Sequence, residues 1–355
     1  MRILIEITHP AHVHFFRNPI RQLSAEGHEI RITSRDKDCT LDLLDRYGIE
    51  HRCLSRQLTG AGMARELIAR NRALIKQAKA FKPDVIAGLG GICAAQVGRL
   101  LRIPSVVFYD TETAHLQNAL TYPFASRVVV PECYRAWTPS RKTVRYRGYH
   151  ELSYLHPKYF QPDLQIARKS GLDPDRDNFL LRLVSWKANH DIGRKGWSPE
   201  LMDSVVSTLQ SRGKVIISSE GELPDHLNDL RYNGDPAEIH HLLAYCRACI
   251  GESATMASEA AILGAPFVYA NVQHVGYVIE QAEQYKMGII PNNHEIATMA
   301  YAIENLLSKT REDYQILFQE MLSEVVDVCQ FASLQITQAA ESKKHPIRSR
   351  RDTAN

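Results

Sequence analysis

Three histidines lie within six positions directly after the first apolar segment of the chain. Residues 3–7 are predicted to form a strand, and His9, His12 and His14 follow it. Open parallel sheets bind ligands at the carboxyl ends of their strands, and an imidazole titrates close to neutral pH, so this loop suits a general base. The His-x-His spacing also fits two metal ligands, but no acid or cysteine is spaced to complete a metal site. A packing role for some of the three rings stays open.

Two acids follow another predicted strand in the same way. The apolar residues 104–109 lead directly into Asp110 and Glu112, with Thr111 between them. Carboxylates at that edge of a sheet can accept a proton or bind sugar hydroxyls. The alternative is an ordinary helix start with a threonine at the N-cap.

The most specific pattern lies in the second half of the chain, where a predicted strand at 248–251 turns directly into a helix at 254–263. Free amides at a helix start, together with the helix dipole, make a site suited to a diphosphate. Glu259 lies one turn further on, where its carboxylate could accept hydrogen bonds from two ribose hydroxyls. Against this, Ser253 or Thr255 could simply cap the helix and Glu259 could be a solvated acid.

A second glycine turn comes after the predicted strand at 84–88. Gly90 and Gly91 stand between that strand and the next helix, where small residues allow phosphate or sugar to approach the backbone. The turn is not a complete Gly-x-Gly-x-x-Gly fingerprint, so a tight strand-to-helix turn explains it equally well.

Cations gather near the end of the predicted strand at 179–185. Arg182 is in the strand, and Lys187 and His190 follow it. Each could neutralise the charge of a diphosphate leaving group, and the sequence does not decide among them.

The elements that must position these residues alternate between strand and helix. Strands are predicted in the first half at 3–7, 29–33, 84–88, 104–109 and 127–131, and in the second half at 179–185, 215–219, 248–251 and 266–269. A helix is predicted at 19–27, between the first two strands. Such alternation predicts an α/β protein with parallel sheets. We expect an N-terminal Rossmann-like domain at 1–150 on the acceptor side, a linker at 151–178 and a second Rossmann-like domain at 179–310. C-terminal helices at 311–342 could pack back on the first domain, and a basic disordered tail is expected at 343–355.

Composition narrows the class of protein. The 355 residues carry a formal net charge of +3, which is too small to predict nucleic-acid binding, and no apolar run is long enough to span a bilayer. No signal peptide is recognisable at the start, so we expect a cytoplasmic protein. A basic amphipathic helix predicted at 64–82 has the composition for peripheral contact with an anionic membrane face, although such charges usually form a solvated surface.

Taken together, four segments make the sequence resemble domain-of-unknown-function family 354. They are the His-Pro-Ala-His-Val-His-Phe-Phe opening at 9–16, the segment 110–112, the Asn-His-Asp-Ile-Gly loop at 189–193 and the Gly-Glu-Ser-Ala-Thr-Met-Ala-Ser-Glu-Ala-Ala segment at 251–261. The resemblance covers residues 1 to about 340. The family is usually grouped with GT-B glycosyltransferases. It is more distantly similar to UDP-N-acetylglucosamine 2-epimerases and to the N-acetylglucosaminyltransferase of peptidoglycan-precursor synthesis.

The resemblance implies a GT-B-like fold, with two Rossmann-like domains facing each other across a cleft and the nucleotide mainly on the second. By it, Gly251, Glu252, Ser253, Thr255 and Met256 line the donor site and Glu259 binds the ribose. His12 matches the Gly-His-Val step of the peptidoglycan enzyme and inherits the role of base, with His9 and His14 as additional ligand contacts. Asp110 and Glu112 fall where the epimerases carry a catalytic acid.

The expected function is therefore a metal-independent glycosyltransferase that needs no cofactor. It would transfer a sugar from a nucleoside-diphosphate donor, with UDP as the expected nucleotide, to a saccharide or lipid-linked acceptor in cell-envelope polysaccharide synthesis. A sugar-nucleotide epimerase and a non-catalytic sugar-nucleotide-binding protein are the alternatives.

Overall fold

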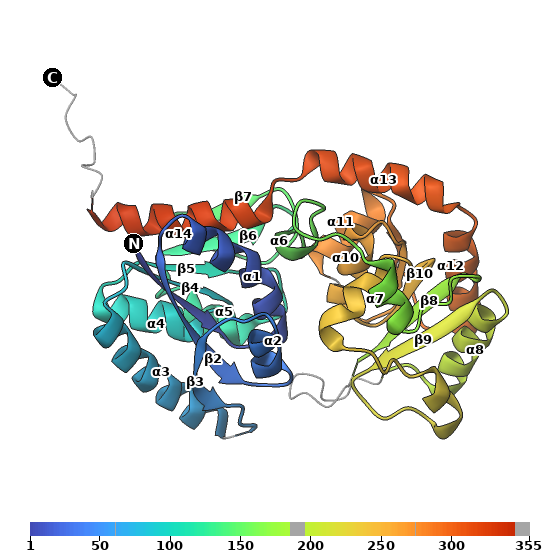
Figure 1. Ribbon diagram of the computed structural model, residues 1–355, viewed down its shortest axis with the longest axis horizontal. Coiled ribbons are helices and arrows are strands. Elements are labelled where there is room, and N and C mark those ends of the chain that lie inside the picture. Colours follow the sequence, from blue (N-terminus) through green and yellow to red (C-terminus); the bar gives the residue numbers. More distant parts are fainter. Residues whose placement is uncertain (61, 185–195, 274, 345–355) are drawn as a thin grey trace. The chain divides into compact units, whose positions relative to one another are not determined.

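The computed structural model describes residues 1–60, 62–184, 196–273 and 275–344. The chain divides into two compact units. The first contains Met1–Tyr154 and the chain from Val326 on, and the second contains Leu155–Val325. Each unit is built on a parallel β-sheet flanked by helices, so the predicted α/β class is confirmed (Figure 1).

The first unit has a seven-stranded sheet in the order β3-β2-β1-β4-β5-β6-β7. Its strands are β1 (Arg2–Ile7), β2 (Glu29–Asp36), β3 (His51–Arg56), β4 (Val85–Leu89), β5 (Ser105–Phe108), β6 (Arg127–Pro131) and β7 (Thr143–Tyr146). All neighbouring pairs are parallel. Because parallel strands end at the same edge, the loops after β1, β4, β5 and β7 meet at one side of this sheet.

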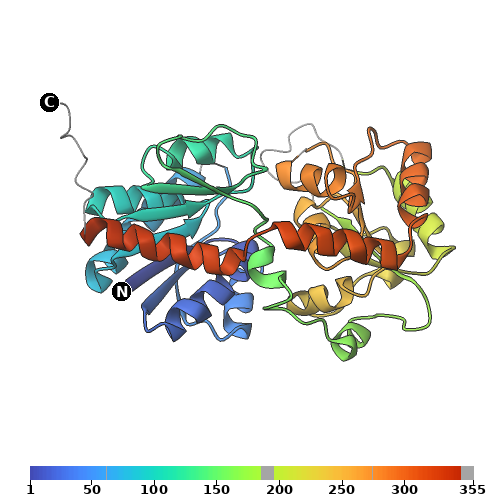
Figure 2. The same ribbon diagram turned by 90° about the horizontal axis from the view of Figure 1, so that it is seen from above.

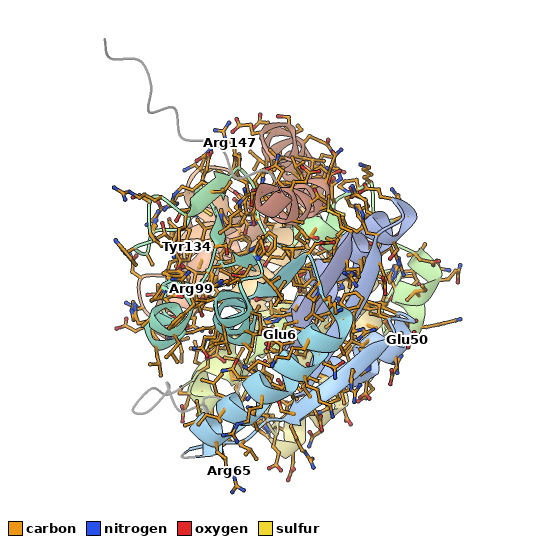
Figure 3. All side chains as sticks on the ribbon, turned by 90° about the vertical axis from the view of Figure 1, so that its left-hand side faces the viewer. Glu6, Glu50, Arg65, Arg99, Tyr134 and Arg147 are labelled. Carbon is orange, nitrogen blue, oxygen red and sulfur yellow. The ribbon has the colours of Figure 1, made fainter. Side chains whose placement is uncertain are left out.

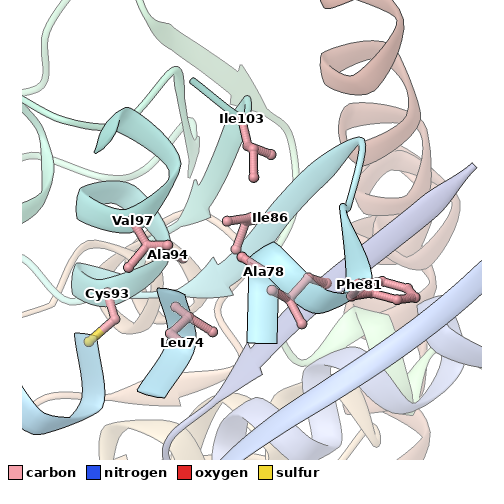
Figure 4. Packing of buried hydrophobic residues seen from close by; sticks show 9 residues of the cluster. Leu74, Ala78, Phe81, Ile86, Cys93, Ala94, Val97 and Ile103 are labelled. Carbon is pink, nitrogen blue, oxygen red and sulfur yellow. The ribbon is translucent and has the colours of Figure 1, made fainter. Parts of the chain in front are cut away.

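Helices pack on both faces of that sheet. The helices of this unit are α1 (Pro10–Ala25), α2 (Thr40–Arg46), α3 (Gly62–Phe81), α4 (Ile92–Leu101), α5 (His115–Thr121), α6 (Leu152–Leu155) and α14 (Val328–Lys344). Figure 4 shows α3 and α4 burying Leu74, Phe81 and Val97 against Ile86 of β4. On the other face α14 packs beside α1, and Figure 2 shows α14 running along the sheet.

The second unit has a five-stranded parallel sheet in the order β12-β11-β10-β8-β9. Its strands are β8 (Asn178–Leu183), β9 (Lys214–Ser219), β10 (Ala248–Gly251), β11 (Phe267–Tyr269) and β12 (Gly288–Ile289). Its helices are α7 (Leu164–Lys169), α8 (Pro199–Gln210), α9 (Ile239–Leu243), α10 (Ala254–Ile262), α11 (Gly276–Glu283), α12 (Ile296–Leu307) and α13 (Arg311–Glu324). Two 3-10 helices, η1 (Asp225–Leu230) and η2 (Pro236–Glu238), complete it.

The structure differs from the sequence prediction at the first helix. The sequence suggested that this helix begins at Pro19, but α1 begins at Pro10 and continues through Pro19. Proline is favoured at the first position of a helix, and from the sequence either Pro10 or Pro19 could occupy that position. The sequence alone therefore did not choose between them. His12 and His14 therefore lie on a helix and not in a loop.

The segment predicted as a linker, 151–178, also has structure of its own. It contains α6 and α7, and α7 packs against α9. The division between units falls after Tyr154. The predicted tail at 343–355 lies, from residue 345, outside the described residues. Within the part of the chain that is described, no helix is both long enough and apolar enough to cross a membrane.

Candidate active site

The first turn of α1 is built from histidine. His9 is the N-cap residue, and its Nδ1 accepts a hydrogen bond from the amide of Ala11 at 3.2 Å. Burial, assisted by the nearby Lys37 ammonium, lowers the pKa of His9 to about 4. His9 is therefore neutral near pH 7, as an acceptor at a helix N-cap must be.

His12 lies one turn further along α1 and is buried. Its Nδ1 accepts a hydrogen bond from the amide of Thr8 at 3.3 Å. Burial and the neighbouring His9 ring hold the pKa of His12 well below its usual value. Because the amide can only donate, this contact favours the neutral tautomer with its proton on Nε2. In that state His12 is a hydrogen-bond donor and would need a tautomer change to act as a base through Nε2.

His14 has a packing environment. Its ring stacks on Tyr154 with the centroids 5.3 Å apart, and its Nδ1 lies 3.3 Å from the hydroxyl of Tyr47. Arg17 joins the same group by donating to the Tyr47 hydroxyl and to the backbone oxygen of Tyr154. These contacts attach α1 to α2 and α6, which gives His14 a structural role.

Asp110 follows β5 and forms an ion pair with a histidine that the sequence analysis did not select. Nδ1 of His150 lies 3.0 Å from Oδ2 of Asp110, and the Thr111 hydroxyl donates to Oδ1 at 2.9 Å. Burial alone would raise the pKa of Asp110, but His150 and this hydrogen bond hold it below its ordinary value. Asp110 is therefore a carboxylate at neutral pH.

His150 comes from the loop after β7, which ends at the same edge of the sheet as β5. Its ring is buried between Phe15 and Tyr146, at centroid distances of 4.8 Å and 6.4 Å. Among the described residues, its Nε2 is buried without a hydrogen-bond partner. His150 was missed because β7 was not predicted, so nothing marked residue 150 as following a strand end. A strand prediction at 143–146 would have placed it at the ligand-binding edge.

Glu112 serves the neighbouring loop. One of its carboxylate oxygens accepts a hydrogen bond from the amide of Arg135 at 3.2 Å. Its side chain is half-buried. This bond connects the loop after β5 with the loop after β6, so Glu112 helps to hold the walls of the site.

The glycine turn before α4 is filled by the protein itself. A buried carboxylate, Glu6 of β1, accepts a hydrogen bond from the amide of Ala94 in the first turn of α4 at 3.0 Å. A Cβ atom on Gly90 would lie 1.9 Å from Nε2 of Gln117, and one on Gly91 would lie 3.0 Å from Val107. Close packing therefore accounts for both glycines. Their predicted contact with substrate stays a prediction.

Glu6 is also the ion-pair partner of one cation in the basic helix predicted at 64–82. Arg70 of α3 is buried, with its Nε 3.4 Å from Oε1 of Glu6 and 3.1 Å from Sγ of Cys93. Arg70 is therefore part of the core, and its inclusion among the solvated cations of residues 64–82 was wrong. The other cations of that helix, Arg65, Arg72, Lys76, Lys79 and Lys82, are exposed. Figure 3 shows Glu6 among the strands and Arg65 projecting from the surface.

In the second unit, the start of α10 has a neutral cap. The hydroxyl of Ser253 accepts a hydrogen bond from the amide of Met256 at 3.3 Å. Gly251, the last residue of β10, has a φ of 152°, and a Cβ there would lie 2.0 Å from the backbone oxygen of Arg182. Thr255 is half-buried in the first turn, and Met256 is buried.

Glu252 holds this turn by hydrogen bonds to two neighbouring loops. Its buried carboxylate accepts from the amide of Val184 at 3.2 Å, and its backbone oxygen accepts from the side chain of Asn271 at 2.7 Å. The contacts tie the end of β10 to the ends of β8 and β11. They give Glu252 a structural task beside the donor-site role that the sequence predicts.

Glu259 has a partner inside the second unit. Its Oε1 lies 2.8 Å from Nε2 of His240 on α9, and both side chains are buried. A ribose bound by Glu259 would either share the carboxylate with His240 or displace His240 from it. The predicted ribose contact therefore depends on the Glu259–His240 hydrogen bond.

Arg182 is held at the end of β8. It donates to the hydroxyl of Ser218 at 2.9 Å and pairs with Glu220. Its charge is thus partly balanced within the unit. The other two cations proposed for the leaving group, Lys187 and His190, lie outside the described residues.

Comparison with known proteins identifies the family. The model of the family described as "Protein of unknown function (DUF354)" matches residues 1–329. The chain belongs to the DUF354 family. A curated relative, an uncharacterised protein of Methanocaldococcus jannaschii, is 25% identical over 295 residues, which cover 79% of this chain and 85% of that protein.

A further match covers only part of the chain. The UDP-N-acetylglucosamine–N-acetylmuramyl-(pentapeptide) pyrophosphoryl-undecaprenol N-acetylglucosamine transferase of Aliivibrio salmonicida is 34% identical over 118 residues, which are 30% of this chain and 33% of that enzyme. The DUF354 chain is therefore similar to this transferase over about a third of either protein.

Solved structures share the fold over the whole chain. A putative UDP-N-acetylglucosamine 2-epimerase from Listeria monocytogenes aligns with a TM-score of 0.71 at 12% identity, covering 100% of this chain and 99% of its own. The calicheamicin glycosyltransferase CalG4 aligns with a TM-score of 0.60 at 16% identity, covering 96% and 98%. The DUF354 chain thus has the GT-B-like fold that its sequence predicted, and at these identities the likeness concerns the fold alone.

Proposed function

We propose that this protein is a metal-independent glycosyltransferase that uses a nucleoside-diphosphate sugar, with UDP as the first nucleotide to test. The observation that carries the proposal is the group of His12, Asp110 and His150 at the ligand-binding edge of the first sheet, in which both histidines are buried and Asp110 is half-buried. An ionised carboxylate can accept the proton of an acceptor hydroxyl, and a neutral imidazole beside it can donate a hydrogen bond to the substrate.

In this proposal Asp110 accepts the proton of the acceptor hydroxyl. The acceptor oxygen then forms a bond to the anomeric carbon of the donor sugar, and the bond from that carbon to the diphosphate breaks. His12 donates from Nε2 to an oxygen of the bound sugar or acceptor, and His150 positions the Asp110 carboxylate. This assignment replaces His12 with Asp110 as the base because the Thr8 amide occupies Nδ1 of His12.

The departing diphosphate is assigned to the start of α10. Its early amides and the helix dipole favour an anion, and the Ser253 hydroxyl adds no competing charge. Arg182 or a residue of the segment 185–195 is proposed to supply positive charge. A saccharide or lipid-linked acceptor in cell-envelope polysaccharide synthesis is the proposed setting.

The donor assignment can be tested without knowing the acceptor. The melting temperature of the full chain is measured with UDP, thymidine diphosphate, UDP-N-acetylglucosamine and AMP as a control. A ligand at 100 times its Kd that binds only the folded state stabilises the protein by about 2.7 kcal/mol. A rise with one nucleoside diphosphate and none with AMP supports the proposal, whereas no rise with any diphosphate rejects it.

The catalytic assignment is tested with Asp110→Asn, and the readout is release of nucleoside diphosphate from the donor found in that screen. Loss of a general base lowers the rate about 10²–10⁴-fold, while donor affinity should stay unchanged. Glu112→Gln is the matched control, since its predicted task is to hold Arg135. Equal loss in both variants would contradict the assignment of Asp110.

A sugar-nucleotide 2-epimerase is the second candidate, favoured by the two acids after β5. Incubation with UDP-N-acetylglucosamine and no acceptor separates the two functions. An epimerase converts it to the manno isomer, seen by proton NMR, whereas a transferase leaves the sugar configuration unchanged.

A further inference from the structure

An apolar pocket of about 480 Å³ lies in the first unit, against α5, the helix that follows the Asp110–Glu112 segment. Its walls come from α5 and from the loop between β6 and β7. The residues that form the apolar lining are Ala119, Tyr122, Pro123, Ala136, Trp137 and Pro139. The side chain of Trp137 is 75% exposed, which is unusual for an aromatic residue that large unless a partner covers it.

The pocket is held by polar contacts behind its apolar surface. The ring of Tyr122 lies 6.2 Å from that of Trp137, and its hydroxyl is 3.0 Å from the hydroxyl of Tyr134, which Figure 3 labels. Arg145 donates to the backbone oxygens of Pro131, Glu132 and Tyr134 and so fixes the start of the loop. The walls are therefore built into the fold.

The loop that lines the pocket is hydrogen-bonded to the loop that carries Asp110. The amide of Arg135, two residues before Trp137, donates to the carboxylate of Glu112. Glu112 in turn lies two residues after Asp110. The pocket and Asp110 therefore belong to loops that are attached to each other.

The loop that forms one wall of the pocket is positively charged. Arg135 and Arg141 are exposed on the same loop, and the ammonium of Lys142 lies 3.1 Å from the backbone oxygen of Pro123 at the pocket. The segment 135–142 contains three cations and no acid. An apolar cavity with Lys142 in its lining and two exposed arginines on the same loop is complementary to a molecule with a hydrocarbon part and an anionic group.

We propose that this pocket binds the apolar part of an anionic amphiphile, with its phosphate or other anionic group held by the cations of the 135–142 loop. We identify this amphiphile with the sugar acceptor, and that identification rests on the proposed function. The binding of an amphiphile in the pocket does not rest on it, because this binding can be measured with the donor absent.

The test is calorimetric titration of the full chain at low salt with three probes: decyl phosphate below its micelle concentration, decanol and inorganic phosphate. Decyl phosphate should saturate one site, decanol should bind at least tenfold more weakly, and inorganic phosphate should not saturate. Lack of saturable binding by decyl phosphate overturns the proposal, as does equal binding by decanol.

Two variants locate the site by opposite changes. Trp137→Ser removes an exposed wall, and Ala119→Phe fills the cavity from an exposed position on α5. Each should weaken decyl phosphate binding at least tenfold without a change in melting temperature. Leu100→Ser, at a 66% exposed position on α4, is the matched control and should bind as the wild type does. Weakening in Leu100→Ser equal to that in Trp137→Ser would overturn the location.

The outcome is independent of the nucleotide screen. Decyl phosphate binding lost in both pocket variants, together with no response to any nucleoside diphosphate, keeps the pocket and rejects the transferase. Nucleotide binding without decyl phosphate binding rejects the pocket and leaves the transferase proposal standing. Binding to anionic vesicles that survives both variants, with no binding of monomeric decyl phosphate, assigns the cations to a membrane surface and overturns the pocket.

Discussion

Two strand-to-helix turns in this protein have similar sequences and different electrostatics. The turn before α4 has glycines at 88, 90 and 91, and the turn before α10 has Gly251 followed by small polar residues. At α4 a buried carboxylate, Glu6, accepts the hydrogen bond of an early amide. At α10 that position is taken by the neutral hydroxyl of Ser253. The Glu6 carboxylate should repel a second anion at the first helix start, so of these two turns we expect the one before α10 to bind a diphosphate.

The largest difference between the turns should appear when each glycine gains a methyl group. At Gly251 the new Cβ would lie 2.0 Å from a backbone oxygen of Arg182, at a φ of 152°. Gly251→Ala should therefore cost about 3–4 kcal/mol of unfolding free energy, from steric overlap and backbone strain together. At Gly90 the obstacle is the end of the Gln117 side chain, which can move. Gly90→Ala should cost only about 1–2 kcal/mol.

Urea titration of both variants measures these two free energies. Equal costs would mean that the β10 turn relaxes as easily as the β4 turn. In that case the rigid placement of the α10 amides, on which the diphosphate assignment depends, would be lost.

Removing the charge of Glu6 tests the other helix start. Glu6→Gln keeps an oxygen for the Ala94 amide but takes away the partner of the buried Arg70. Arg70 retains Glu66, 3.5 Å away, so the expected cost is about 2–3 kcal/mol and not the full cost of breaking a buried pair. Glu50→Gln, at an exposed position, is the control and should change stability by less than about 0.5 kcal/mol. A cost near zero for Glu6→Gln would show that α4 does not depend on this carboxylate.

Features that depend on neighbouring residues could be predicted from the sequence, whereas contacts between distant residues could not. The alternation of apolar and helical segments predicted both parallel sheets, and the helix cap at Ser253, which the sequence offered as an alternative to a diphosphate site, is present in the structure. The Glu6–Arg70 pair joins residues 64 positions apart, and no local sequence pattern predicts it. His150 was hidden for a similar reason, because its partner Asp110 is 40 positions away and β7 is only four residues long.

A third helix start, that of α1, should make stability depend on pH. The pKa of His9 is about 4 in the folded protein and about 6.5 in the unfolded chain, so between these values only the unfolded chain takes up the proton. Stability should therefore fall as the pH decreases from 6.5 toward 4. Asp110 acts in a lower window, because its depressed pKa removes stability only below about 4.

The measurement is the melting temperature at pH 7.5 and pH 5. His9→Asn keeps an N-cap acceptor and removes the titrating group. Its loss on acidification should be roughly 2–4 °C smaller than that of the wild type, the shift expected for about 1 kcal/mol. Equal losses would place the pH-dependent groups elsewhere.

The smallest expected change in stability gives the sharpest test of the comparison. Ser253→Asp replaces the neutral cap of α10 with a carboxylate, which reproduces the arrangement that Glu6 creates at α4. Aspartate and serine are comparable N-caps, so the free energy of unfolding should change by less than about 0.5 kcal/mol. Binding of the nucleoside diphosphate found by thermal shift should nevertheless weaken at least tenfold, because the new charge lies where the diphosphate is proposed to bind. Ser253→Asn, which caps equally well without charge, should retain most of the affinity. If the aspartate and asparagine variants bind alike, the start of α10 does not hold the diphosphate, and the difference between the two turns concerns packing alone.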